Sequence, residues 1–387
     1  MSGEYLELVL DSGSSDTWVI ESGYNCADPA TCDPSDPYDT CDINDPGFPC
    51  YFGRPYNFSS TWSQIPDENF NVTYADNEIV AGLLGHETIT LAGITVPSTI
   101  IGVATFAAWY GDTISSGLLG MAYPFLTNGY SGDNPADDTG NGYIQYNPVF
   151  TTMYSNNLVA PIWSLALNRP PANLSEYESA DGPGGLLALG GIPDIPHGTY
   201  WANTTIHSLG TSYATGQQVY EYYTITVGGY AVSQDQGAQF NVANVSASST
   251  THTALLAPQT TAIVDSGTNL IYVPEEVVID VANSFLPPGY YDNEYQSYMV
   301  PCDAVAPLFG VEIAGKIFYV NPRDLVGPPT NYPYCAMGVQ PNSGSFNILG
   351  DAWLRNVLAV FDVGNGEMRF AAREFVLAPD GQIGDPA

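Results

Sequence analysis

The chain has 387 residues, of which 44% are hydrophobic, and this length is enough for two domains that each bury a core. Its 41 acidic residues outnumber 7 lysines and arginines and give a net charge of −34, which excludes nucleic acid and anionic membranes as partners because both bind clustered cations. No apolar run approaches the roughly 18 residues of a membrane span.

The first predicted element is a short buried strand that ends at a turn. Two apolar residues lead into Asp11, Ser12 and Gly13, where the glycine frees the backbone. The hydroxyl of Ser14 is placed to donate a hydrogen bond to the carboxylate of Asp11. Because Asp-Ser-Gly is also ordinary turn chemistry, a single copy would not indicate a function.

Four of the six cysteines fall in the next segment, which contains several Asp-Pro pairs and predicts an acidic surface loop. Cys26, Cys32, Cys41 and Cys50 allow three pairings among themselves, and the sequence does not choose between them. The aspartates lack the spacing of a calcium-binding loop, and no cysteine pair or histidine group has zinc-site spacing. We therefore expect no metal and no other cofactor.

Short strands between turns follow, which is typical of an all-β protein. Hairpin turns are predicted at Ala92-Gly93, Gly228-Gly229 and Ala314-Gly315, and residues 128–147 are predicted to form a second surface loop. Few helices are expected. One follows Asn147 and Pro148 as N-cap and first position, with a buried face of Val149, Phe150, Met153 and Tyr154. Another opens at Pro274, with Val277, Val278, Val281 and Phe285 on one side.

A stretch rich in proline, glycine, serine and asparagine at residues 169–185 predicts a linker between two lobes, residues 1–168 and 186–387. In the second lobe, two apolar residues again lead into Asp265, Ser266, Gly267 and Thr268. One copy in each half predicts two related lobes that each bring one carboxylate to a shared site. Ser12 and Ser266 are expected to bridge the two loops.

The even cysteine count and five N-glycosylation sequons predict disulfides and the secretory route. The sequons begin at Asn57, Asn71, Asn173, Asn203 and Asn244. Because the chain has few bases, self-repulsion in acid stays mild once the carboxylates are protonated, and the composition suits work at low pH.

In this order the motifs resemble those of the pepsin-like aspartic proteases of the fungal secreted type, over nearly the whole chain. The Asp11 motif followed by Trp18 resembles the first active-site motif of the family, and the Asp265 motif resembles the second. Each is followed by an apolar-apolar-Gly segment, at residues 117–124 and 348–351. Cys302 and Cys335 resemble the disulfide of the C-terminal lobe. The resemblance implies an all-β, bilobal fold of two β-barrel-like lobes with the active site in the cleft between them.

Residues 72–82 resemble the flap of the family, a hairpin that closes over bound peptide. Tyr74 falls at the position of the flap tyrosine, which in the family is hydrogen-bonded to a tryptophan that matches Trp18. The tip carries Asp76 and Asn77 where the family has glycine-rich sequence, and we expect the hairpin to form with an altered substrate preference. The residues expected to contact apolar side chains of the substrate are Phe106, Trp109 and Leu118.

The resemblance implies a monomeric endopeptidase that cleaves extended peptides at acidic pH, outside the cell or in a vacuole. Asp11 and Asp265 would share one proton and activate water, supported by the hydroxyl and glycine residues of their motifs. Ser12 stands where the family usually has threonine. We also expect a processed or truncated form or a misplaced start codon, because Tyr5–Leu10 is too short for a signal peptide and the prosegment and first strand of the family are not seen. Two alternatives stay open, a non-catalytic peptide-binding or inhibitor-like protein on the same fold and an inactive N-terminally truncated form.

Overall fold

The computed structural model describes residues 4–31, 50–138, 142–169, 184–212, 215–238, 253–256, 259–331, 333–342, 346–373, 376–377 and 383–384. The chain divides into two compact units: unit 1 contains Met1–Val159 and Leu209–Tyr222, and unit 2 contains Ala160–Ser208 and Tyr223–Ala387. The chain therefore leaves unit 1, enters unit 2, and returns for one short segment before it goes back. The predicted linker at residues 169–185 lies mostly outside the described residues, and the predicted lobe boundaries stay a prediction.

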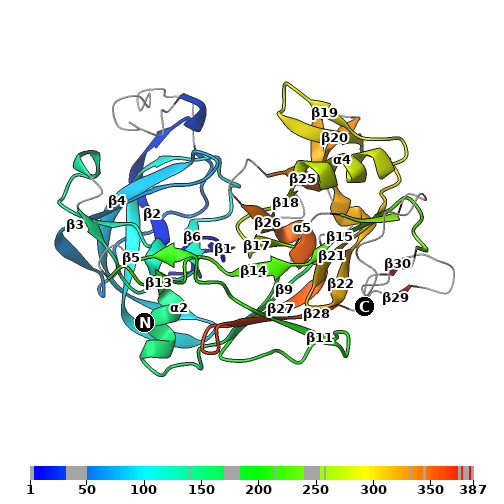
Figure 1. Cartoon of the computed structure of the whole chain (residues 1–387). Coiled ribbons are helices and arrows are strands. Elements are labelled where there is room, and N and C mark those ends of the chain that lie inside the picture. Colours follow the sequence, from blue (N-terminus) through cyan, green and yellow to red (C-terminus); the bar gives the residue numbers. More distant parts are fainter. Residues whose placement is uncertain are drawn as a thin grey trace. The chain divides into compact units, whose positions relative to one another are not determined.

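Unit 1 is built on one eight-stranded sheet (Figure 1). Its strands, in spatial order, are β1 (Val9–Asp11), β6 (Gly117–Gly120), β2 (Thr17–Ala27), β5 (Ile94–Ala108), β4 (Ile79–Leu91), β3 (Ser63–Thr73), β7 (Gly129–Ser131) and β8 (Tyr143–Ile144). The described part of unit 1 also has the small pair β12 (Gly210–Thr211) and β13 (Gln218–Val219), the helix α2 (Val149–Ser155) and the 3-10 turns η1 (Pro29–Thr31), η2 (Pro124–Leu126) and η3 (Pro135–Asp137). The sheet is open, since β1 and β8 lie at opposite ends of the strand order.

Two features of unit 1 test the sequence predictions directly. The hairpin of β4 and β5 turns at Ala92 and Gly93, whose φ angles of 49° and 79° are those of a two-residue turn, so this prediction is confirmed. The prediction of a surface loop at residues 128–147 is wrong, because β7 pairs with β3 and β8 pairs with β7 at the edge of the sheet. These strands are only two or three residues long, so they leave no alternating apolar pattern in the sequence.

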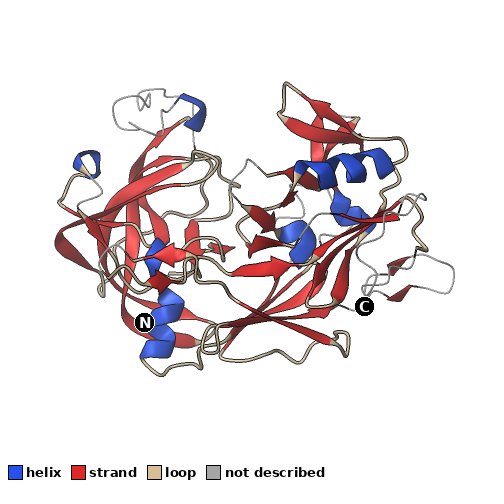
Figure 2. Ribbon diagram, viewed as in Figure 1, coloured by secondary structure: helices blue, strands red, loops and turns tan. Residues whose placement is uncertain are grey.

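Unit 2 contains several smaller sheets, and strands predominate over helices in both units (Figure 2). One sheet has the order β10 (Gly185–Leu189), β9 (Trp163–Leu167), β27 (Val357–Asp362), β28 (Glu367–Ala372) and β11 (Trp201–Thr205), and a second has β14 (Thr224–Val227), β17 (Thr260–Val264), β26 (Asn347–Leu349), β18 (Ile271–Val273) and β25 (Val339–Pro341). A third has β16 (Thr253–Leu256), β15 (Gly229–Ser233), β21 (Leu308–Ile313) and β22 (Lys316–Val320). A fourth has β19 (Tyr290–Asp292), β20 (Ser297–Pro301), β24 (Tyr334–Met337) and β23 (Val326–Asn331), and β29 (Val376–Leu377) pairs with β30 (Ile383–Gly384). The helices in the described part of unit 2 are α4 (Glu275–Ser284) and α5 (Asp351–Leu354), with the 3-10 turn η5 (Pro322–Leu325).

One predicted hairpin of unit 2 forms and one does not. β21 and β22 turn at Ala314 and Gly315, with φ angles of 48° and 83°. The hairpin predicted at Gly228-Gly229 is wrong, because β14 pairs with β17 while β15 pairs with β16 and β21. Neither of these two glycines has the positive φ of a hairpin turn, so the chain continues and passes from one sheet to another.

Both predicted helices are present. α2 begins one residue later than predicted, with Pro148 rather than Asn147 as its N-cap, and it buries Val149, Phe150 and Met153 while Tyr154 is only half-buried. α4 follows Pro274 and buries Val277, Val278 and Val281, and Phe285 is buried at its end. No helix among the described residues is long and apolar enough to cross a membrane.

Two disulfides are seen in the described part of the chain. Cys302 pairs with Cys335, as the family resemblance implied. Cys26 pairs with Cys50, which settles one of the open pairings, whereas Cys32 and Cys41 lie outside the described residues.

Candidate active site

The Asp11 carboxylate lies in a turn at the end of β1. β1 runs parallel to β6 with Asp11 opposite Gly120, and the N–H of Met121 donates to the carbonyl of Asp11 at 2.8 Å. Asp11 is only 5% exposed. The N–H of Gly13 donates to its Oδ1 at 2.7 Å, and the Ser14 hydroxyl donates to its Oδ2. The turn therefore places one donor on each carboxylate oxygen.

Unit 2 builds the same turn around Asp265. It follows β17, which runs parallel to β26, and the N–H of Asp265 donates to the carbonyl of Leu349 at 3.1 Å. The N–H of Gly267 donates to Oδ1 at 2.8 Å, and the Thr268 hydroxyl donates to Oδ2 at 2.6 Å. The hydroxyl contacts predicted from the two motifs are confirmed, and two segments far apart in the chain hold a carboxylate in one geometry. Whether Ser12 and Ser266 bridge the two loops stays a prediction.

Gly120, the last residue of β6, and Gly350, which follows β26, are glycines for a packing reason. A Cβ on Gly120 would overlap with the backbone of Ser15 and Asp16, and a Cβ on Gly350 would overlap with the carbonyls of Thr268 and Leu270. Each apolar-apolar-Gly segment can therefore lie against its aspartate turn only with glycine at this place.

The predicted flap is a hairpin between β3 and β4. The N–H of Tyr74 donates to the carbonyl of Glu78 at 2.8 Å, and the N–H of Asn77 donates to the carbonyl of Tyr74 at 3.0 Å. Asn77 has a φ of 71°, a conformation that asparagine tolerates better than most residues. Asp76 is exposed at the tip, and its Oδ1 accepts a hydrogen bond from the N–H of Glu78 at 3.1 Å. The hairpin thus forms without the glycines of the family pattern.

An aromatic cluster lies around Trp18. Its indole N–H donates to the hydroxyl of Tyr74 at 2.8 Å, as the resemblance implied. The ring of Trp109 packs edge-on against both, with centroids 5.2 Å from Trp18 and 5.4 Å from Tyr74, and it stacks on Phe52 at 6.0 Å. Leu118 belongs to the same core. No sequence pattern pointed to Phe52, which follows the cysteine-rich loop.

Phe106 lies in a different place. It packs with Ala27, Ile79 and Ala108 in a separate small core at the turn end of the hairpin. Trp109 and Leu118 therefore lie together around Trp18, and Phe106 does not join them. A role of these residues in binding substrate stays a prediction.

A buried carboxyl group, Asp16, was missed by the sequence analysis. Its oxygens accept hydrogen bonds from the N–H of Asn128 at 2.9 Å, from the Asn128 side-chain amide at 2.8 Å and from the Tyr146 hydroxyl. Burial nevertheless raises the pKa of Asp16 above its ordinary value. The pKa of Tyr74 is also raised, mainly by burial and further by the charges of Asp16 and Asp11.

A second missed carboxyl group, Asp351, begins α5 beside the Asp265 turn. Its N–H donates to the carbonyl of Thr268 at 2.7 Å. Burial raises the pKa of Asp351 to about 7, the charge of Asp265 acts in the same direction, and Arg355 opposes them. Asp351 is thus neutral through the acidic range.

A model of the family described as eukaryotic aspartyl protease matches residues 2–192 and 198–373, and the chain belongs to this family. It is therefore a protease of the aspartic class, and its substrates are peptides. Among the described residues, no group of three histidine, cysteine or acidic side chains could hold a metal ion.

Individual relatives place the chain further within the family. The probable aspartic-type endopeptidase of Aspergillus fumigatus is 35% identical over 386 residues, which cover 96% of this chain and 77% of the relative. Barrierpepsin of Saccharomyces cerevisiae is 27% identical, over 95% of this chain and 57% of the relative. The crystal structure of the aspartic proteinase from Irpex lacteus is similar with a TM-score of 0.64 at 19% identity, over 96% of this chain and 91% of that one. This likeness confirms the predicted mostly-β, bilobal fold class.

Proposed function

We propose that the protein is an acid endopeptidase in which Asp11 and Asp265 act as one pair. The observation that carries the proposal is the carboxylate turn that the chain builds twice, with a glycine N–H on one oxygen and a hydroxyl on the other. A chain that used only one aspartate would have no need of the second copy, so the repeat supports a shared site.

The mechanism follows from the electrostatics of such a pair. Two carboxylates about 3 Å apart repel by ~5 kcal/mol at an effective dielectric near 20, so only one of them is ionised over a wide acidic range. A shared proton on two carboxyl groups is the known arrangement of aspartic proteases, which we apply to Asp11 and Asp265. The ionised partner takes a proton from a held water, the water attacks the peptide carbonyl, and the protonated partner polarises the carbonyl oxygen.

The aromatic cluster around Trp18 supports a site for apolar side chains of an extended peptide. Tyr74 and Trp109 are half-buried, so their rings keep an open side, and Leu118 adds aliphatic surface. In this proposal the hairpin of β3 and β4 is the flap that closes over the peptide, with the acidic side chain of Asp76 at its tip.

The test is peptide hydrolysis at about pH 4 by the wild type and by the variants Asp11→Asn and Asp265→Asn, which keep the shape of each turn. We expect the kcat of each variant to fall at least about 1,000-fold. The remaining carboxyl group would then act alone, without the acid or base partner that the pair supplies. Hydrolysis that survives in Asp265→Asn would show that the pair mechanism is wrong. A wild type that binds a statine-type transition-state mimic but cleaves nothing would instead identify a peptide-binding protein on this fold.

We also propose that the protein is a monomeric glycoprotein of the secretory pathway, found outside the cell or in a vacuole. The two disulfides support an oxidising compartment. Asn57 and Asn203 are exposed sequon residues, although the side-chain amide of Asn57 donates to Glu4 at 3.4 Å. The side-chain amide of Asn71, which is half-buried, donates to Pro135 and Asp138. Enzymatic deglycosylation of the protein secreted by a eukaryotic host should lower its mass, and an unchanged mass would contradict the proposal.

A further inference from the structure

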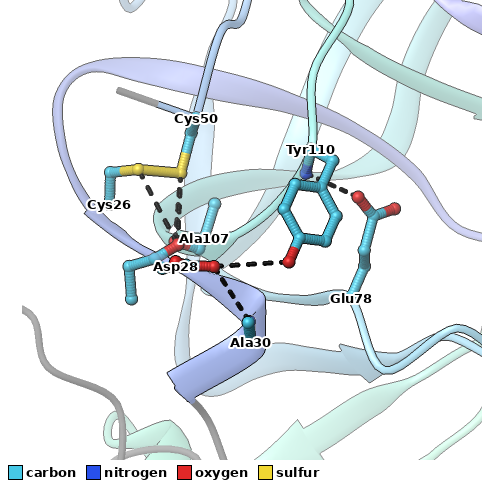
Figure 3. Close-up of a disulfide and its surroundings, with 8 residues drawn as sticks. Cys26, Asp28, Ala30, Cys50, Glu78, Ala107 and Tyr110 are labelled. Atoms are coloured by element: carbon cyan, nitrogen blue, oxygen red, sulfur yellow. Dashed lines mark hydrogen bonds between the residues drawn. A yellow bond between two sulfur atoms is a disulfide. The ribbon is translucent and has the colours of Figure 1, made fainter. Parts of the chain in front are cut away.

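The turn end of the hairpin carries a buried acidic side chain, Glu78, that the proposed mechanism does not use. Glu78 is 8% exposed and directly precedes β4. Its Oε1 accepts a hydrogen bond from the backbone N–H of Tyr110 at 2.6 Å (Figure 3). Within the described part of the chain, no cation forms an ion pair with it.

This hydrogen bond extends the ladder between β4 and β5. The last paired residues of the two strands at this end are Ile79 and Ala108. Glu78 stands one residue before that pair and Tyr110 two residues after it, so the carboxyl oxygen supplies the acceptor for the next N–H of the ladder. The side-chain carboxyl group thus takes the place of a backbone carbonyl as the hydrogen-bond acceptor.

The Tyr110 end of this contact is fixed to a rigid part of unit 1. The N–H of Gly111 donates to the carbonyl of Cys50 at 3.1 Å, and Cys50 is joined to Cys26 at the end of β2. The hydroxyl of Tyr110 also donates to Asp28 at 3.3 Å (Figure 3). Glu78 therefore connects the hairpin to the segment that the disulfide holds.

The same residue closes the turn that carries Tyr74. The carbonyl of Glu78 accepts the N–H of Tyr74, whose hydroxyl accepts the indole N–H of Trp18. A shift of Glu78 away from Tyr110 would therefore move the tyrosine that lies on the aromatic cluster.

We propose that Glu78 is a positioning residue of the protease, whose carboxyl group fastens the flap hairpin to Tyr110 and so holds Tyr74 over the substrate. This inference rests on the proposed function, because it takes the hairpin as the flap. It adds a residue that contacts neither the catalytic aspartates nor the peptide.

The protonation of Glu78 makes the opening of the hairpin depend on pH. Burial and, to a smaller extent, the neighbouring Asp76 raise the pKa of Glu78 to about 8, although the hydrogen bond from the Tyr110 N–H lowers it. The other titratable groups that face it are the hydroxyls of Tyr74 and Tyr110. When the hairpin opens, Glu78 is exposed and regains an ordinary pKa near 4.5. Opening therefore releases a proton between these two values and becomes more favourable as pH rises through them.

The first test is hydrogen exchange at the Tyr110 N–H in the ligand-free protein between about pH 5 and 8. After correction for intrinsic exchange, we expect the opening constant of the wild type to rise by up to about tenfold per pH unit and that of Glu78→Gln to stay constant. The glutamine keeps the acceptor oxygen and removes the titration. A pH dependence that is the same in both proteins would overturn the proposal.

The second test separates binding from chemistry at about pH 4. We expect Glu78→Ala to raise KM and the Kd of a statine-type inhibitor about tenfold each, with kcat changed less than about threefold, and Glu78→Gln to restore KM and Kd to within about twofold. The matched control is Glu87→Gln, which removes another carboxyl group of β4 and should leave KM and Kd unchanged. An unchanged KM and Kd in Glu78→Ala would overturn the proposal.

The two tests also distinguish this inference from the proposed function. If the wild type cleaves no peptide but shows the expected hydrogen exchange, the proposed protease function is wrong, and the role of Glu78 in holding the hairpin is supported. If the wild type cleaves peptides but the opening of its hairpin does not depend on pH, the role of Glu78 is wrong, and the proposed protease function is supported.

Discussion

The two units handle their acidic side chains in different ways. Unit 1 has 21 acidic residues and one cation, Arg54, for a net charge of −20, whereas unit 2 has 20 acidic residues and six cations, for −14. In unit 2 two buried carboxylates are paired with arginines, Asp324 with Arg169 at 2.8 Å and Asp362 with Arg369. In unit 1 the buried carboxyl groups of Asp16 and Glu78 have hydrogen-bond donors but no ion pair among the described residues.

The difference teaches that the stability of the two units depends on pH to different extents. A carboxyl group whose pKa is raised keeps its proton in the folded state after the unfolded chain has lost it, so stability falls as pH rises from the unfolded pKa to the folded one. Raised pKa values of this kind occur in unit 1 at Glu21, Asp138 and Glu221 as well as at Asp16 and Glu78, and in unit 2 at Asp351. Unit 1 should therefore lose more stability than unit 2 as pH rises above the ordinary carboxyl pKa values of 3.8 and 4.5.

The largest expected effect comes from breaking the buried ion pair of unit 2. The side chains of Arg169 and Asp324 are 9% and 4% exposed. The substitution Arg169→Met leaves the Asp324 carboxylate buried without its arginine partner. We expect the free energy of unfolding of unit 2 to fall by about 3–5 kcal/mol at pH 7. The loss should be smaller at about pH 4, because the stranded carboxyl group can then take up a proton. Hydrogen exchange at β27 and β28 measures it, and an equal loss in unit 1 would contradict the comparison.

A smaller effect is expected from Asp16→Asn in unit 1. At acidic pH the substitution should lower the free energy of unfolding by about 1–2 kcal/mol, since the amide oxygen cannot accept from all three donors around it. Above the ordinary pKa of 3.8 the wild type loses stability as pH rises, and the variant should lose less. Urea unfolding at a series of pH values gives the slope, and a slope equal to that of the wild type would argue against Asp16 as a source of the pH dependence.

Glu87→Gln is the matched control for Asp16→Asn. Glu87 accepts hydrogen bonds from the hydroxyls of Tyr56, Ser59 and Thr61, which with the Thr88 N–H lower its pKa although burial opposes them. The contribution of the Glu87 carboxylate to stability is complete above pH 4.5, and it is lost only as pH falls through the pKa of Glu87 in the folded protein. The variant should therefore lower stability without changing the slope between about pH 5 and 8.

The smallest effect should come from the single cation of unit 1. The ion pair of Arg54 with Glu4 is 2.6 Å long, but the arginine side chain is 65% exposed. We expect Arg54→Met to change the stability of unit 1 by less than about 1 kcal/mol. Thermal unfolding at low and high salt measures it, and a loss as large as that of Arg169→Met would remove the distinction between the two units.

The sequence predicted the parts of the molecule that depend on near neighbours. The turn at Ala92-Gly93 and the hydroxyl of Thr268 on Asp265 involve residues at most three positions apart, so their geometry follows from local chemistry. The hairpin predicted at Gly228-Gly229 failed because the two strands beside it take their partners from elsewhere in the chain.

The rest of the site depends on contacts across long stretches of chain. Asp16 meets Asn128 and Tyr146 at separations of 112 and 130 residues, and Glu78 meets Tyr110 at 32. A lone acidic residue near a strand is most often a solvated one, and nothing in its sequence surroundings tells that a distant segment will bury it. Resemblance to a family pointed to the two aspartate motifs, but it did not point to these distant neighbours.

The return of residues 209–222 to unit 1 has a consequence for synthesis on the ribosome. This segment supplies the ring of Tyr220, which stacks on Tyr123 at 5.0 Å, and the carbonyl of Glu221, which accepts the N–H of Tyr123. Unit 1 therefore cannot be completed when Val159 emerges and must wait for about 60 further residues, or ~3–12 s at about 5–20 residues per second. During that interval the nascent chain carries an unfinished first unit while the second has begun, and chaperones have their best opportunity to bind it.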